Sequence, residues 1–145
     1  MHEQRRILIV DDHADLRLLL QECLDDGRGT YAYREAENGA EALACVASFA
    51  PQVVILDVML PGGMDGYAIC QAIKARGNGS AAPHVLMLSA CGQQADREKG
   101  RAAGADQYLV KPFSPLGLIA AVEQFFSAGQ GASLPDDGRQ RTQKR

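Results

Sequence analysis

The sequence predicts an α/β fold in which a mainly parallel sheet is covered by helices on both faces. Short apolar runs suited to buried strands alternate along the chain with longer segments whose apolar residues recur at helical spacing. Five strands and five helices can be placed in this alternation, which is the pattern of a doubly wound parallel sheet. At 145 residues, 46% of them hydrophobic, the chain is long enough for one domain with a single core.

The first half of the chain is expected to contain three strands and two helices. The strands are assigned to residues 7–10, 31–36 and 53–57, and the more polar second strand is placed at the edge of the sheet. Asn38 and Glu41 form a capping box at the start of the second helix. The apolar face of the first helix is expected to comprise Leu16, Leu19, Leu20, Cys23 and Leu24.

A turn-rich loop at residues 60–66 leads into the third helix. This helix is expected to bury Ile69, Cys70 and Ile73, and to end in a glycine-rich loop at residues 77–80.

The fourth and fifth strands are assigned to residues 85–89 and 106–110, with a helix between them at residues 93–104. That helix is polar and contains Gly100, which favours a mobile element.

The last helix begins at Ser114, which caps it, and Pro115 occupies its first turn. Its inner face is expected to comprise Leu118, Val122, Phe125 and Phe126. From Gly129 onward, Gly, Gln, Ser, Pro and charged residues dominate. Residues 5–128 are therefore assigned to the domain, and residues 129–145 to a flexible tail or a truncated linker.

Composition excludes several classes of function. The formal net charge of -3 and the absence of Trp argue against direct nucleic-acid binding. None of the four cysteines has CxxC spacing, so neither a zinc site nor a disulfide framework is indicated. No segment approaches the roughly 20 apolar residues that a membrane span needs. Reduced thiols and the lack of an export signal favour the cytoplasm.

Four of the expected strands lead into polar residues. Asp11 and Asp12 follow the first strand, Asp57 ends the third, Ser89 ends the fourth and Lys111 follows the fifth. The carboxyl ends of parallel strands meet at one edge of the sheet, where ligands of such folds bind. Carboxylates held this close repel one another, and Mg²⁺, which prefers carboxylate oxygens, relieves that repulsion.

This set of residues resembles the receiver domain of two-component response regulators. The motifs that carry the resemblance are Asp11-Asp12, Asp57, Leu60-Pro61-Gly62, Asp65-Gly66-Tyr67, Ser89-Ala90 and Lys111-Pro112-Phe113. The resemblance covers residues 5–128 and implies a flavodoxin-like sheet of strand order 2-1-3-4-5. Two departures are an extra residue, Gly63, in the loop and Ser89 where Thr is commoner.

The resemblance also implies roles for these residues. Asp57 would accept a phosphoryl group from a phosphohistidine on a sensor histidine kinase or a phosphotransfer protein. Lys111 would neutralise charge on that group, and Ser89 would contact one of its oxygens. The implied ligands of Mg²⁺ are Asp12, Asp57 and the backbone carbonyl of Met59, with Asp11 assisting, often through water. The domain would be a signalling switch and not an enzyme, beyond phosphorylating and dephosphorylating itself.

The switch implied by the resemblance involves movement of Ser89 and an inward turn of Tyr108. The face formed by the fourth helix, the fifth strand and the fifth helix would then bind a downstream effector. The Lys111-Pro112 bond is expected to be cis. Met59 and Cys91 each lie two residues beyond a site residue, and they either shape water access or are neutral loop residues.

Other interpretations stay open at the level of the sequence. The chain is either a stand-alone receiver or part of a longer regulator. A phosphohydrolase acting on small phosphate esters would share the Asp nucleophile, Mg²⁺ and a Lys, but Asp57 lacks a second Asp two residues on. A flavin or nucleotide carrier on the same fold is disfavoured, because the carboxylates would repel an anionic cofactor.

Overall fold

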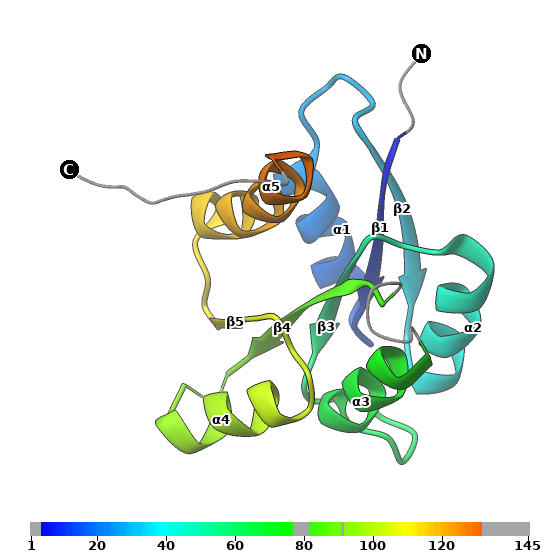
Figure 1. Cartoon of the computed structure of the whole chain (residues 1–145), viewed down its shortest axis with the longest axis vertical. Coiled ribbons are helices and arrows are strands. Elements are labelled where there is room, and N and C mark those ends of the chain that lie inside the picture. Colours follow the sequence, from blue (N-terminus) through cyan, green and yellow to red (C-terminus); the bar gives the residue numbers. More distant parts are fainter. Residues whose placement is uncertain (1–3, 77–81, 91, 132–145) are drawn as a thin grey trace.

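The computed structural model describes residues 4–76, 82–90 and 92–131, with side chains through residue 127. Five parallel strands form one sheet in the order β2-β1-β3-β4-β5, which confirms the expected topology. The elements are β1 (Arg5–Val10), α1 (Ala14–Leu24), β2 (Tyr31–Ala36), α2 (Gly39–Phe49), β3 (Val53–Asp57), α3 (Gly66–Arg76), β4 (His84–Ser89), α4 (Gln94–Ala102), β5 (Gln107–Val110) and α5 (Pro115–Gly131). Helices cover both faces of the sheet (Figure 1).

The sheet separates two apolar cores. Val54 and Leu56 of β3 pack with α2 and α3 on one face, whereas Val53 and Ile55 pack with α1 and α5 on the other. Every residue of β3 is buried. An apolar run without polar alternation is what a strand covered on both faces requires, so the interpretation of residues 53–57 is confirmed.

The expected face of α1 is wrong at one position. Leu20 and Leu24 are buried as expected, but the side chain of Leu19 is 48% exposed. Arg17 takes the inward position instead and is 7% exposed. Residues 17, 20 and 24 are spaced three and four apart and therefore lie on one side of the helix, while Leu19 is rotated away.

Two predicted helix caps are confirmed. The Asn38 side chain accepts a hydrogen bond from the Glu41 amide at 2.9 Å, and the Glu41 carboxylate accepts from the Glu37 amide at 2.9 Å. At α5, the Ser114 hydroxyl accepts from the Gly117 amide at 2.8 Å. Both side chains satisfy amides that have no partner within their own helix.

Several element boundaries differ from expectation. Strand β1 begins at Arg5, β4 at His84 and β5 at Gln107, each within two residues of the expected start. Helix α4 spans Gln94–Ala102 and is shorter than the expected range of 93–104. Helix α5 continues to Gly131, past Gly129, where the tail was expected to begin. The rest of that tail, the glycine-rich loop at residues 77–80 and Cys91 lie outside the described residues.

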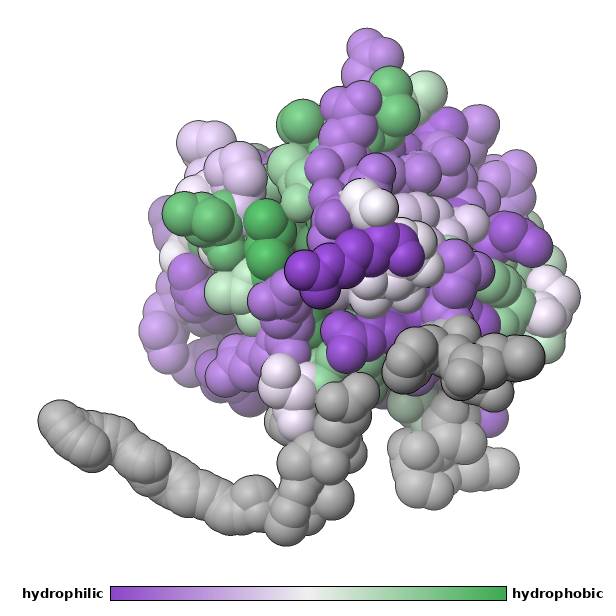
Figure 2. Space-filling view, turned by 90° about the horizontal axis from the view of Figure 1, so that it is seen from above, coloured by the Kyte–Doolittle hydropathy of each residue, from purple (hydrophilic) through white to green (hydrophobic). Residues whose placement is uncertain are grey.

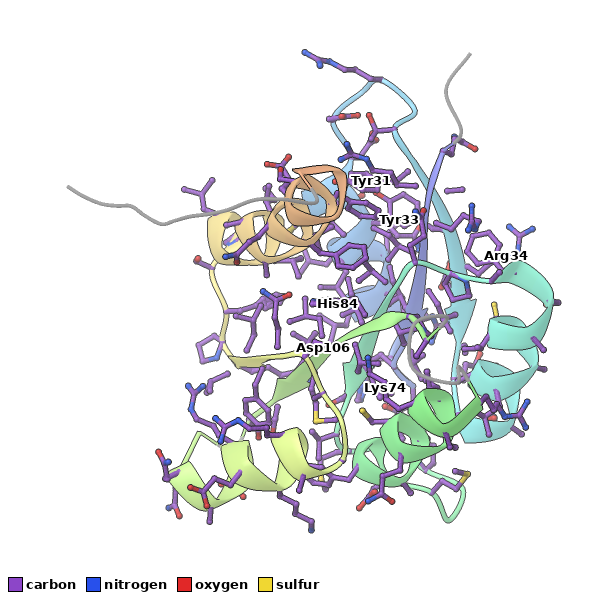
Figure 3. The ribbon with its side chains drawn as sticks, viewed as in Figure 1. Tyr31, Tyr33, Arg34, Lys74, His84 and Asp106 are labelled. Atoms are coloured by element: carbon purple, nitrogen blue, oxygen red, sulfur yellow. The ribbon has the colours of Figure 1, made fainter. Side chains whose placement is uncertain are left out.

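Ionic contacts join the strands at the amino edge of the sheet. Lys74 of α3 donates a hydrogen bond to the Pro83 carbonyl at 2.8 Å and contacts the Asp106 carboxylate (Figure 3). Asp106 in turn accepts from the Val85 amide at 2.8 Å. His84 pairs with Gln107 at 2.7 Å. These contacts fix the start of β5 against β4.

The face in Figure 2 is mainly hydrophilic, with separate small hydrophobic patches. Among the described residues, none of the helices has the length and apolar character needed to cross a bilayer.

Candidate functional site

The carboxyl edge of the sheet carries a buried carboxylate at the end of its central strand. Asp57 is the last residue of β3, and it is 4% exposed. The next residue, Val58, donates its amide to the Leu88 carbonyl at 3.0 Å, so the chain still pairs with β4 where the side chain emerges. The amide of Met59 donates to Asp57 Oδ1 at 3.3 Å, whereas the Met59 side chain is 69% exposed. The backbone of Met59 is thus the part that lies near Asp57.

Lys111 brings a cation to this carboxylate from the end of β5. Its Nζ lies 3.4 Å from Asp57 Oδ2 and 3.9 Å from Asp11 Oδ2. The Lys111 amide donates to the Ser89 carbonyl at 2.7 Å, and Ser89 is fully buried. The Lys111-Pro112 bond is cis, as expected.

The two acids after β1 have different environments. Asp11 is 1% exposed, and its Oδ2 has no hydrogen-bond partner among the described residues. The Asp12 side chain is 33% exposed. His13 lies against both, because its Nδ1 is 3.2 Å from Asp11 Oδ1 and 3.2 Å from Asp12 Oδ1. His13 was not among the candidate residues, although its place directly after the acidic pair was a signal in the sequence.

Arg17 is a second residue that the candidate set omitted. From α1, its Nη1 donates to the Asp11 carbonyl at 2.6 Å and its Nε donates to Glu35 Oε1 at 2.6 Å. The guanidinium therefore ties the acidic loop to the end of β2. The Glu35 carboxyl is stabilised in its charged form by this hydrogen bond, which lowers its pKa.

The charges at this edge do not balance. Burial raises the pKa of Asp57, the neighbouring Asp11 carboxyl raises it further, and Lys111 opposes both effects. Asp11 and Asp57 together carry more negative charge than Lys111 neutralises, and Asp11 Oδ2 is left without a hydrogen bond in the described part of the chain. A hard divalent cation would fit these carboxylate oxygens and would supply the missing positive charge.

Tyr108 lies on β5 beside α4. Its ring is half-buried, and the Arg97 guanidinium lies 5.5 Å from the ring centroid. A Cβ atom built on Gly100 would come within 2.9 Å of the ring, so this glycine lets α4 approach β5 closely.

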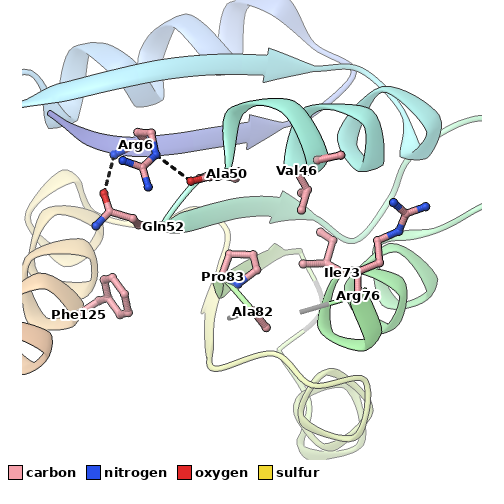
Figure 4. A pocket seen from close by; sticks show the side chains of 11 residues that line it. Arg6, Val46, Ala50, Gln52, Ile73, Arg76, Ala82, Pro83 and Phe125 are labelled. Carbon is pink, nitrogen blue, oxygen red and sulfur yellow. Dashed lines mark hydrogen bonds between the residues drawn. The ribbon is translucent and has the colours of Figure 1, made fainter. Parts of the chain in front are cut away.

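A cavity of about 560 Å³ lies at the opposite edge of the sheet (Figure 4). Arg6, Gln52 and Pro83, which stand at or before the starts of β1, β3 and β4, contribute to its lining. It contains none of the candidate site residues and is separate from the acidic edge.

A model of the response regulator receiver domain matches residues 7–123. The chain belongs to the response regulator receiver family. The match confirms the resemblance to receivers that the sequence indicated. A receiver is a domain of two-component signalling systems. The transcriptional regulatory protein ResD of Bacillus subtilis is 42% identical over 120 residues, which are 83% of this chain and 47% of ResD.

Solved receiver structures share the fold. The BeF3-activated receiver domain of DrrB is 32% identical, with a TM-score of 0.74 over 86% of this chain and 99% of that domain. The chemotaxis protein CheY4 of Vibrio cholerae is 30% identical, with a TM-score of 0.74 over 84% of this chain and 98% of CheY4. This receiver chain spans about half the length of the curated relatives it matches.

Proposed function

We propose that this receiver accepts a phosphoryl group on Asp57 from a phosphohistidine of a sensor kinase or phosphotransfer protein in the cytoplasm. The observation that carries the proposal is the position of Lys111 Nζ, 3.4 Å from Asp57 Oδ2 and 3.9 Å from a second buried carboxylate, Asp11. Residues 5–128 are proposed as the unit that performs this transfer.

Each side chain has a task in that transfer. An oxygen of ionised Asp57 attacks phosphorus, the phosphorus–nitrogen bond breaks, and the imidazole of the donor leaves. Lys111 places a positive charge beside the transferred oxygens, and the Ser89 hydroxyl provides a further hydrogen bond. Asp11, Asp12, Asp57 and the Met59 carbonyl are the proposed Mg²⁺ ligands. When bound, Mg²⁺ neutralises charge on the phosphoryl oxygens.

The phosphoryl group then adds charge locally, and this charge shifts the equilibrium between two conformations of the domain. It adds about 1.5–2 negative charges and three acceptor oxygens next to Ser89 and Lys111. Both residues join the ends of β4 and β5, and Tyr108 lies three residues before Lys111 on β5. The surface of α4, β5 and α5 is the proposed binding site for a downstream effector.

A phosphohydrolase for small phosphate esters has less support. Such an enzyme would need a general acid near Asp57 to protonate the leaving group. The residue two positions on is Met59, whose side chain is 69% exposed and has no acidic group.

The test is incubation of the full chain with acetyl phosphate and Mg²⁺, followed by intact-mass measurement. We expect one added phosphoryl group, labile to base, and no label without Mg²⁺. The variant Asp57→Asn is expected to take up none, whereas Asp65→Asn, a matched change at an exposed acid, should be labelled normally. Equal labelling of Asp57→Asn would show that another residue is the acceptor.

A further inference from the structure

We propose that His13 is an additional ligand of the divalent cation in the acidic pocket. Its imidazole nitrogen would shift the preference of the pocket from Mg²⁺ towards transition metals such as Mn²⁺, Co²⁺ and Ni²⁺. This inference rests on the proposed function only in taking the pocket to bind a cation.

The spacing of the three donor atoms is that of ligands around one ion. His13 Nδ1 lies 3.2 Å from Asp11 Oδ1 and 3.2 Å from Asp12 Oδ1, and the ligand atoms of the three residues lie within 4.8 Å of one another. Nitrogen and oxygen ligands about 2.0–2.1 Å from a metal are separated by about 2.9 Å at a right angle and about 3.4 Å at a tetrahedral angle. The observed distances from His13 fall in this interval. The contact of His13 Nδ1 with Asp11 Oδ1 also has the geometry of a hydrogen bond, which a bound ion would replace.

A second observation concerns the other oxygen of the Asp11 carboxylate, Oδ2, which lies on the side of Lys111. Asp11 is 1% exposed, yet its Oδ2 has no hydrogen-bond partner among the described residues. Lys111 Nζ, 3.9 Å from that oxygen, lies closer to Asp57 Oδ2, at 3.4 Å. A buried carboxylate oxygen without a hydrogen bond is costly, and a bound cation would compensate it.

The backbone holds the His13 ring over the acids. His13 is the N-cap residue of α1, with φ -103° and ψ 113°, but its side chain makes no capping hydrogen bond in the described structure. Its amide donates to Asp11 Oδ1 at 2.7 Å, which closes a tight turn between the two residues. The ring is thereby directed to the carboxylates and not to the helix amides, and at 72% exposure it remains accessible to an incoming ion.

The ligand type determines which metal benefits. Carboxylate, carbonyl and water ligands suit Mg²⁺, Ca²⁺ and Mn²⁺, whereas imidazole suits later transition metals, whose affinities rise from Mn²⁺ to Ni²⁺. A pocket with His13 as a ligand should therefore bind Ni²⁺ and Co²⁺ much more tightly than a pocket of oxygens alone. Mg²⁺ dehydrates reluctantly and should gain little from the ring.

The experiment uses the full chain loaded with Mn²⁺ and pulsed electron paramagnetic resonance, which detects a nitrogen nucleus bound to the ion. We expect a ¹⁴N coupling in the wild type that is absent from His13→Gln. The control is His84→Gln, since His84 is bound to Gln107 at the far edge of the sheet, and it should retain the coupling. By calorimetry, His13→Gln should weaken Ni²⁺ binding about tenfold or more and change Mg²⁺ binding less than about threefold.

Two outcomes would overturn the inference while leaving the proposed function intact. The first is Mn²⁺ binding with no ¹⁴N coupling. The second is an equal loss of Mg²⁺ and Ni²⁺ affinity in His13→Gln, which indicates that His13 only pairs with the acids. If the wild type binds none of these metals, the cation pocket itself is refuted, and the proposed function fails with it.

Discussion

The chemistry of this receiver begins with an excess of negative charge at single residues. Asp11 and Asp57 are both at most 4% exposed, and Lys111 lies within 4 Å of each. One ammonium group cannot neutralise two buried carboxylates, so the metal-free pocket stores unfavourable electrostatic energy. In the proposed function, the same imbalance would make this edge of the sheet receptive to a cation.

This imbalance predicts that Asp57→Asn stabilises the metal-free protein. The pKa of Asp57 is raised, first by burial and then by Asp11, so the folded state holds this proton to a higher pH than the unfolded chain does. The contribution of Asp57 to stability therefore falls as pH rises from the ordinary value of 3.8 through the raised pKa. We expect the melting temperature of Asp57→Asn to exceed that of the wild type by a few degrees at pH 7.

The difference should disappear below pH 3.8, where the carboxyl is protonated in both states. It should also shrink with saturating Mg²⁺, which stabilises the wild type by binding its ionised form. Thermal melts of both proteins across pH, with and without Mg²⁺, measure this difference in melting temperature. An unchanged or lower melting temperature for Asp57→Asn at pH 7 without metal would contradict the charge argument.

At the scale of elements, periodicity and capping residues predicted most of the structure. The apolar run 53–57 became the central strand, and Asn38 and Ser114 cap their helices, because these signals depend on nearby residues only. Leu19 was assigned inward wrongly, since the buried Arg17 occupies that side of α1. A buried arginine is not expected from hydropathy, and its partner Glu35 is distant in sequence.

The candidate site was predictable to a similar extent. The strand-end residues Asp11, Asp57 and Lys111 come together because parallel strands bring their carboxyl ends to one edge. The contacts of His13 and Arg17 with the acidic loop depend on the turn after β1 and on the rotation of α1. The position of His13 directly after Asp11-Asp12 was a signal in the sequence, but the turn that places its ring against the acids was not. Nothing in residue type and spacing indicates the contact of Arg17 with the Asp11 carbonyl.

The loop between β3 and α3 depends on close approach at one glycine. A Cβ atom on Gly66 would lie 2.4 Å from the Asp57 carbonyl oxygen and 2.6 Å from Val58 Cα, both of which are backbone atoms. Gly66→Ala must therefore displace the backbone that carries Asp57. We expect a loss of about 1–3 kcal/mol of stability, together with weaker Mg²⁺ binding and slower labelling by acetyl phosphate.

The matched control is Gly63→Ala in the same loop. Gly63 has φ +86°, and a Cβ atom added there would meet nothing within 4 Å, so alanine strains the backbone without a clash. Its cost should be about 1–2 kcal/mol, with Mg²⁺ affinity and labelling close to the wild type. Chemical denaturation measures the loss of stability in each variant, and calorimetry measures its Mg²⁺ affinity. Weaker Mg²⁺ binding in both variants would argue against the specific role of Gly66.

For the whole molecule, the question is how a charge at one edge of the sheet reaches a distant surface. Lys111 contacts Asp57 with its side chain and Ser89 with its amide, so it connects the pocket to the end of β5. All four residues of β5 are only half-buried, in contrast to β3, which allows the strand to adjust. In the proposed switch, phosphorylation would shift the α4, β5 and α5 surface only through contacts that differ between the two states.

Lys111→Ala is therefore expected to uncouple the pocket from that surface. BeF3 with Mg²⁺ serves as the phosphoryl mimic, and hydrogen exchange reports on the amides of α4 and β5. In the wild type, BeF3 should change the rate of hydrogen exchange in both elements. Lys111→Ala should still bind Mg²⁺ but show no such change in exchange. Fluorine NMR is used to confirm that BeF3 occupies the site in the variant. Lys99→Ala, a change at an exposed lysine on α4, should respond as the wild type does. A full exchange response in BeF3-loaded Lys111→Ala would exclude Lys111 as the link, because the signal would then pass through Ser89 or the backbone without it.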